Sequence, residues 1–269
     1  MVRAGWGVLL AAVLIAGCGD QPTEDGAGRQ PEPSPPPVEH NLEPLADAVT
    51  RALREQGSAR VSGDATDVGG QAGVQGTARF DTAQTDLDVA LERRASQDSG
   101  PERTRLVIVE GKGYLRPPPA VTPANRPWVR LDPASGDEFQ QYAAQVAHAL
   151  RVTVDPRRAL ELAVAGGHVA GSERQTLDNT GVVHYTIDID LARALERRAE
   201  NQVLQRVVDS GARALRLELW LDNRNLPLRV KSDEGLPALN RFVADVRFDR
   251  WAAAANITPP NSQEIANPA

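Results

Sequence analysis

Residues 182–190 read VVHYTIDID and residues 212–222 read ARALRLELWLD, and these two stretches decide the fold class. In both, apolar and polar side chains alternate along most of the run. Successive side chains of a β-strand point to opposite faces of a sheet, so the alternation predicts two strands with one buried and one solvated face. The side chains predicted to share the buried face are Val183, Tyr185, Ile187, Ile189, Leu215, Leu217, Leu219 and Leu221.

Shorter alternating runs, separated by glycine, proline and aspartate, predict further strands on both sides of these two. They cover residues 59–66, 72–80, 85–93, 103–110, 113–116, 128–131, 168–176, 227–232 and 239–249. A glycine-flanked pair at residues 111–113 predicts a tight hairpin, and residues 251–269 are predicted to form an irregular tail. The pattern indicates an antiparallel meander.

Four segments instead repeat apolar residues at helical spacing. They are residues 42–56, 137–150, 156–166 and 191–209. Asp155-Pro156 has the order of a helix N-terminus, a capping side chain followed by proline at the first helical position. On the two central helices, the stripe predicted to face the sheet includes Phe139, Tyr142, Val146 and Leu160.

The N-terminus predicts export and lipidation. Arg3 precedes a short apolar run, residues 8–15, and two small residues stand directly before Cys18, the single cysteine. Such a run is too short to span a bilayer and is typical of a signal peptide. Residues 14–18, LIAGC, resemble a bacterial lipobox, which implies that residues 1–17 are removed and that Cys18 carries a lipid anchor. An unpaired thiol would otherwise remain in an oxidising compartment.

Residues 18–40 are predicted to be a lipidated, disordered tether, and residues 41–269 a single folded domain. The tether is rich in proline and polar residues and holds few apolar side chains that could offset the entropy of ordering. Its proline run at residues 31–37 favours extended polyproline II, at about 3.1 Å per residue. The tether therefore gives the folded domain reach from a membrane surface.

Composition and motif content exclude several classes of function. A formal net charge of −6 argues against binding of nucleic acid. No nucleophile elbow, P-loop or Rossmann glycine pattern occurs where a strand meets a helix, so the protein is predicted not to be an enzyme and to use no cofactor. No metal site is predicted either, because the four histidines lack ligand-like spacing. They are His40, His148, His168 and His184.

Two further features of the sequence are candidate sites. Asp188 and Asp190 lie on one face of a strand, where paired carboxylates could act as acid and base. Because that face is the polar one and Asp190 precedes a helix, a structural role is the favoured interpretation. Trp220 lies opposite the leucine row, so it either faces water, covers a second apolar layer or contacts a partner; Trp128 and Trp251 are the other two tryptophans of interest.

Several short motifs, taken in chain order, resemble the LppX/LprG-like lipoproteins of the actinobacterial cell envelope. They are VEGKGYL at 109–115, PWV at 127–129, GGHVAGSE at 166–173, VHYTIDID at 183–190, LWLD at 219–222, LPLRV at 226–230, FDRW at 248–251 and ITPP at 257–260. The resemblance implies an α+β fold similar to LolA, in which a strongly curved antiparallel sheet, a half barrel, wraps over helices. It also implies an apolar cavity that in some members holds the acyl chains of a lipid or glycolipid.

The sequence and the resemblance together predict a lipoprotein anchored through Cys18 on the extracytoplasmic face of the cell membrane, with a lipid or glycolipid in its cavity. The predicted lining is Phe139, Tyr142, Val146, Leu160, Val183, Tyr185, Ile187, Ile189, Leu215, Leu217, Leu219 and Leu221. An ordinary filled core would use the same residues. The competing interpretation is therefore a structural lipoprotein that recruits or regulates an envelope protein, and an extracytoplasmic hydrolase ranks last.

Overall fold

The computed structural model describes residues 38–67, 70–80, 84–94, 101–118, 122–132, 134–199, 202–209, 211–234 and 242–266. All of them belong to one compact unit, Ser34–Ala269. The predicted signal peptide, Cys18 and most of the predicted tether lie outside the described residues. Within the described ranges, no helix combines the length and the apolar character needed to cross a bilayer.

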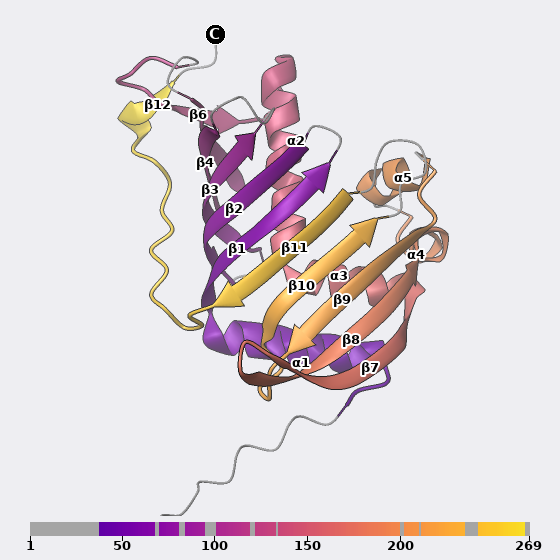
Figure 1. Cartoon of the computed structure of the whole chain (residues 1–269). Helices are drawn as coiled ribbons and strands as arrows, with labels where there is room; N and C mark the ends of the chain where they lie inside the picture. Colours follow the sequence, from indigo (N-terminus) through magenta and orange to yellow (C-terminus); the bar gives the residue numbers. More distant parts are fainter. Residues whose placement is uncertain are drawn as a thin grey trace, which may run out of the picture. The chain divides into compact units, whose positions relative to one another are not determined.

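The described strands form one twelve-stranded sheet in the order β12-β6-β5-β4-β3-β2-β1-β11-β10-β9-β8-β7. The strands are β1 (Ser58–Asp67), β2 (Gly70–Arg79), β3 (Asp86–Arg94), β4 (Glu102–Val109), β5 (Lys112–Arg116), β6 (Trp128–Leu131), β7 (Gly167–Leu177), β8 (Thr180–Asp190), β9 (Ala214–Leu221), β10 (Pro227–Glu234), β11 (Phe242–Asp249) and β12 (Ile265–Ala266). Every neighbouring pair is antiparallel except β12 and β6. The sheet is curved and, over the described residues, unclosed, with β12 and β7 at its two ends (Figure 1).

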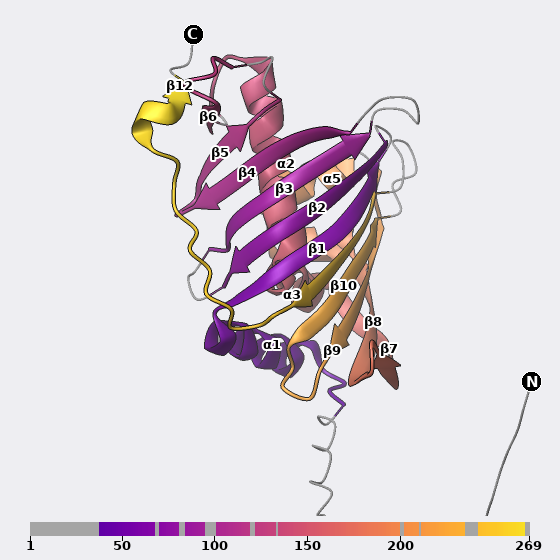
Figure 2. The ribbon, with the colours of Figure 1, turned by 60° about the vertical axis from the view of Figure 1, so that its left-hand side comes forward.

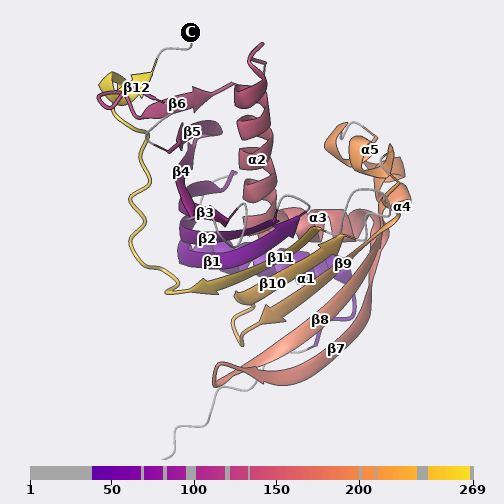
Figure 3. The same cartoon turned by 45° about the horizontal axis from the view of Figure 1, so that its top comes forward.

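The helices gather on one face of this sheet, which we call the inner face (Figure 3). They are α1 (Leu42–Gln56), α2 (Glu138–Val154), α3 (Pro156–Gly166), α4 (Leu191–Arg197) and α5 (Gln202–Asp209). Three aspartates cap them as acceptors: Asp137 accepts from the Gln140 amide, Asp155 from Arg157 and Asp190 from Arg193. α3 packs against α1, α2 and α4 and lies on β7 and β8.

The main apolar core fills the space between the inner face and the helices. On β4, Leu106 and Ile108 belong to this core, whereas Val107 and Val109 point the other way and join a smaller cluster with Ile257. We call that opposite side the outer face. The C-terminal segment 251–266 runs along the outer face and brings Ile257 onto it (Figure 2).

Glycines in the middle of β1 and β2 let neighbouring strands approach closely. A Cβ on Gly76 would lie 2.1 Å from the carbonyl oxygen of Asp88, and one on Gly63 would lie 2.4 Å from that of Asp245. Only a residue without a side chain fits at such positions, which favours a bend in the sheet.

Three expectations about local structure were wrong. The predicted helix over residues 191–209 is two helices, because α4 ends at Arg197 and the next residue, Arg198, has non-helical backbone angles of φ −138° and ψ 50°. The predicted tight hairpin is present, but its turn is Glu110-Gly111, with positive φ values of 51° and 76°, as a type I′ turn requires, and not the glycine-flanked pair beside it. The C-terminal tail is not wholly irregular, since a 3-10 turn (Ser262–Glu264) leads into β12, which pairs with β6.

Candidate ligand-binding site

The predicted apolar rows of β8 and β9 face each other in register. Val183 pairs with Leu221, Tyr185 with Leu219, Ile187 with Leu217 and Ile189 with Leu215. All eight side chains are buried, as is Leu160 of α3, which packs on β8. The sequence therefore identified nine residues that the fold brings together on the inner face.

These nine residues belong to one contiguous core cluster with the buried side of α1. None of them lines either of the two pockets described below. Around β8 and β9 the structure is therefore that of a packed core, the arrangement typical of protein interiors.

α2 presents a different face to the core than the sequence predicts. Its buried side chains are Gln140, Ala143, Ala147 and Val154, whereas Phe139 is 44 % and Val146 37 % exposed. The apolar stripe of α2 is wider than the part of the helix that contacts α3, β5, β6 and β11. The small side chains of Ala143 and Ala147 occupy this contact. Phe139 and Val146 are therefore corrected from buried to exposed positions. Tyr142 lies in α2, but its side chain falls outside the described residues.

Tyr185 connects the core to the start of the folded chain. Its hydroxyl accepts a hydrogen bond of 3.0 Å from the backbone N–H of Glu39. Burial raises the pKa of Tyr185 above its ordinary value, so the phenol stays neutral over the physiological range. Val38 packs against the same core. The last residues before α1 are therefore held by the domain, although the sequence assigns them to the tether.

The paired carboxylates Asp188 and Asp190 have structural roles. Asp188 accepts from Arg216 at 2.8 Å, and this hydrogen bond is the main reason why the pKa of Asp188 lies below its ordinary value. Asp190 caps α4. Each carboxylate is occupied by a different partner, so the favoured structural interpretation is confirmed.

Trp220 is covered by its neighbours on the outer face. The His184 ring stacks on it at a centroid distance of 4.2 Å, and the Arg229 guanidinium lies 4.8 Å from its ring centroid. Its indole N–H donates to Gln175 at 3.3 Å. The tryptophan is 6 % exposed, so it does not face water. Its cover consists of an imidazole and a guanidinium and is not the second apolar layer that the sequence allowed.

The other two tryptophans are also packed inside the fold. Trp128 is buried in the outer-face cluster with Ile257. Trp251 is half-buried and packs on the rings of Phe80 and Phe248, at centroid distances of 5.9 and 5.8 Å. Neither side chain forms an exposed aromatic patch.

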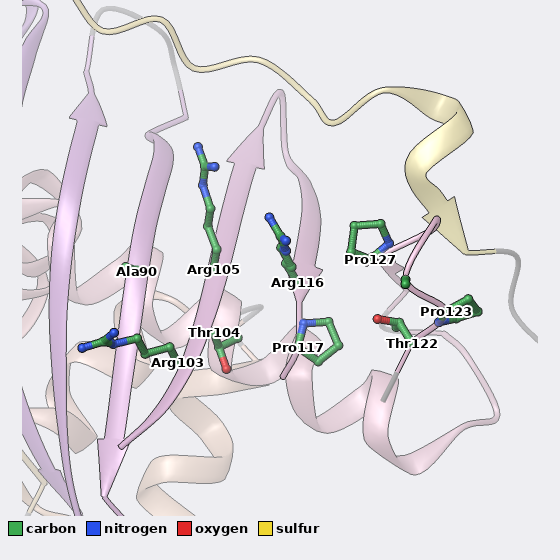
Figure 4. Close-up of a pocket in the computed structure, with 10 residues that line it drawn as sticks. Ala90, Arg103, Thr104, Arg105, Arg116, Pro117, Thr122, Pro123 and Pro127 are labelled. Carbon is green, nitrogen blue, oxygen red and sulfur yellow. The ribbon is translucent and has the colours of Figure 1, made fainter. Parts of the chain in front are cut away.

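Two pockets open on the outer face, near β4, β5 and β6. The first, of about 490 Å³, has walls of proline and alanine and contains three arginines, Arg103, Arg105 and Arg116 (Figure 4). The second, of about 620 Å³, lies between these strands and the C-terminal segment near Pro259-Pro260. Both include Arg105 and Arg116, so the two pockets meet at this arginine pair.

The sequence reasoning missed this arginine pair. Arg105 and Arg116 are directly opposite each other in the β4–β5 ladder. The predicted hairpin placed its turn at residues 111–113, whereas the observed two-residue turn at 110–111 fixes the register that pairs Arg105 with Arg116. No group of histidine, cysteine and carboxylate side chains suited to a metal ion occurs among the described residues.

Comparison with solved structures gives matches to two mycobacterial proteins at low sequence identity and low TM-score. LprF from Mycobacterium bovis has a TM-score of 0.47 at 12% identity, with 81% of this chain and 96% of that chain covered. The Mycobacterium tuberculosis lipoprotein LppX has a TM-score of 0.42 at 12% identity, with 81% and 98% covered. No family model and no curated protein sequence matches the chain.

Proposed function

We propose that the protein is a non-enzymatic, lipid-anchored envelope lipoprotein that binds a hydrophobic ligand, a lipid or glycolipid, on the inner side of a half-barrel sheet. One observation carries the proposal. The exposed large hydrophobic side chains of the described residues are Phe139, Val146 and Val152, and all three lie on α2. Single exposed apolar residues are normal, but Phe139 and Val146 share one edge of α2, and this pair supports a surface that binds an apolar ligand.

Phe139 and Val146 lie along one edge of α2. Residues seven positions apart lie about 20° from each other around a helix and about 10.5 Å apart along it. Both flank Ala143 and Ala147, which already contact the core. An acyl chain laid along this edge would extend the apolar core outward, and burial of a side chain such as Phe contributes about 1.5–3 kcal/mol.

Native mass spectrometry of the full chain, exported and purified from an actinobacterial host without detergent exchange, tests the ligand. We expect copurifying lipid with the wild-type protein and a several-fold loss with Phe139→Glu or Val146→Glu. Val152→Glu is the matched control, because Val152 is equally exposed on the same helix but about 120° away from Val146 around its axis. Absence of lipid from the wild-type protein, or equal loss in all three variants, would contradict the proposal.

The proposed anchor is Cys18, at the extracytoplasmic face of the cell membrane. Metabolic labelling with a palmitate analogue should modify the wild-type chain and leave Cys18→Ala unlabelled and released from the membrane fraction. Labelling of the Cys18→Ala chain would refute the anchor without affecting the ligand test. The tether then sets the distance over which the folded domain can work.

The packed core under β8 and β9 favours a second candidate, an interaction lipoprotein that uses the sheet as a scaffold. In that case the exposed edge of α2 would contact a protein. The same mass-spectrometry experiment separates the two candidates, because a scaffold would carry no lipid in any variant.

A further inference from the structure

We propose that the arginine pair Arg105 and Arg116 on the outer face forms a binding site for a phosphate group carried on a small organic body. This site is separate from the exposed edge of α2 and does not depend on the proposed function. The argument starts from the sheet register. The two residues stand directly opposite each other on β4 and β5. Like charges in this position destabilise an antiparallel pair unless something neutralises them.

Only one of the two guanidinium groups is neutralised within the described residues. Arg105 forms a bidentate pair with Asp88, with distances of 2.8 and 2.6 Å. The Arg116 side chain is exposed and has no hydrogen bond or ion pair to any residue that the structure describes. Figure 4 shows the two side chains extending in the same direction from neighbouring strands. An anion placed between them would receive several charge-assisted hydrogen bonds.

The charged residues around the pair favour a ligand with negative charge. Arg103 enters the same pocket, and within the described part of the chain its side chain has one exposed contact, of 3.3 Å to Glu92. Three arginines face two carboxylates, Asp88 and Glu92, so the arginine side of the pocket has an excess of positive charge. Glu264 lies in the second pocket and disfavours an anion at that end.

The walls of the first pocket fit a phosphate with an attached body. Its volume of about 490 Å³ lies in the range of small-molecule pockets and far exceeds one water, about 30 Å³. Pro117, Pro123 and Ala124 give it an apolar side on which glycerol or a sugar could rest. Arginine is suited to phosphate because its planar fork matches the phosphate oxygens. The chemical class is therefore a glycerol or sugar phosphate, free or as the headgroup of an anionic lipid.

Titration calorimetry on the full chain in a nonionic detergent at low salt tests the site. The probes are glycerol 3-phosphate, short-chain phosphatidylglycerol below its critical micelle concentration, and glycerol alone as the phosphate-free control. We expect saturable binding of a phosphate probe and none of glycerol. Equal affinity for both phosphates would identify a free organic phosphate as the source, and tighter binding of phosphatidylglycerol would identify a lipid headgroup.

Three variants make the assignment specific. Arg116→Gln should weaken binding about tenfold or more, since it removes charged donors from the ligand. Arg130→Gln, at an exposed arginine of β6 that lines neither pocket, should leave the affinity unchanged. Asp88→Asn should tighten binding, because it releases Arg105 from a competing carboxylate. Failure of both phosphates to bind, or equal losses in Arg116→Gln and Arg130→Gln, would overturn the proposal.

Discussion

Arg157 closes a buried ion pair with Asp155, the residue two positions before it. Its Nε and Nη2 atoms donate to the two carboxylate oxygens at 2.9 Å each, and both side chains are almost completely buried. The same guanidinium reaches the Phe80 carbonyl at 3.1 Å and the Thr85 hydroxyl at 2.9 Å. Asp155 also caps α3, so one cluster joins the α2–α3 corner to the connection between β2 and β3.

Replacement of Arg157 by alanine should destabilise the fold strongly. The change leaves the Asp155 carboxylate buried without its main partner, and breaking one side of a buried pair costs about 3–5 kcal/mol. Urea denaturation followed by circular dichroism measures the loss. The control is Arg158→Ala, because Arg158 is the next residue and its pair with Glu161 is exposed, so about 0.5 kcal/mol or less is expected. Similar losses in both variants would show that the buried pair is not what holds this corner.

The pair between Arg229 and Asp245 predicts a loss of stability in acid. The hydrogen bonds from Arg229 hold the pKa of Asp245 below its ordinary value. A carboxyl group whose pKa is lower in the folded state stabilises the fold fully above its unfolded pKa, about 3.9. This contribution is lost as the pH falls through the lower, folded pKa.

Asp245→Asn should therefore lower the melting temperature at pH values near neutrality and reduce its dependence on pH below about 4, since the side chain no longer titrates. Asp249→Asn, an exposed position on the same strand, should follow the wild-type curve. Thermal melts over a pH series measure both. Parallel curves for Asp245→Asn and the wild type would contradict the assigned role of the pair.

Local features of this fold, such as helix caps, were predictable from the sequence. Contacts between residues far apart in the chain were predictable only where apolar and polar residues alternate strictly. The caps at Asp155 and Asp190 follow from local chemistry alone. The cross-strand pairs of β8 and β9 follow from strict alternation, because a slip of one residue would expose every leucine and isoleucine.

The exposed face of α2 could not be predicted in the same way. Phe139 and Val146 share a helical stripe with Ala143 and Ala147, and periodicity cannot tell which edge of a wide stripe meets its neighbours. That choice was made by the tertiary contact with α3 and β11. The arginine pair was missed for a related reason, since its meaning depends on the position of Asp88 on a third strand.

Gly76 provides a test of the strand packing that bends the sheet. A Cβ at this position would meet the Asp88 carbonyl oxygen at 2.1 Å and the Val89 Cα at 2.6 Å, and backbone atoms cannot move aside as a flexible side chain can. Gly76→Ala should therefore cost about 1–3 kcal/mol, the usual range for overpacking. Gly73→Ala, on the same strand, is the control because its nearest contact would be an ordinary 3.7 Å. Equal stability of the two variants in urea would contradict the close approach.

Tyr185→Phe should loosen the start of the folded domain without disturbing the packing of its core. The variant keeps the buried ring and removes only the acceptor of the Glu39 amide, a hydrogen bond with a net contribution of about 1 kcal/mol. Hydrogen exchange at the Glu39 amide should become faster, while amides in β8 and β9 keep their protection. Tyr114→Phe, which removes a hydroxyl from the outer-face cluster, should leave exchange at Glu39 unchanged. Unaltered exchange in Tyr185→Phe would contradict this role of the hydroxyl. The packing of Val38 on the core would then hold the segment before α1 without the hydrogen bond to Tyr185.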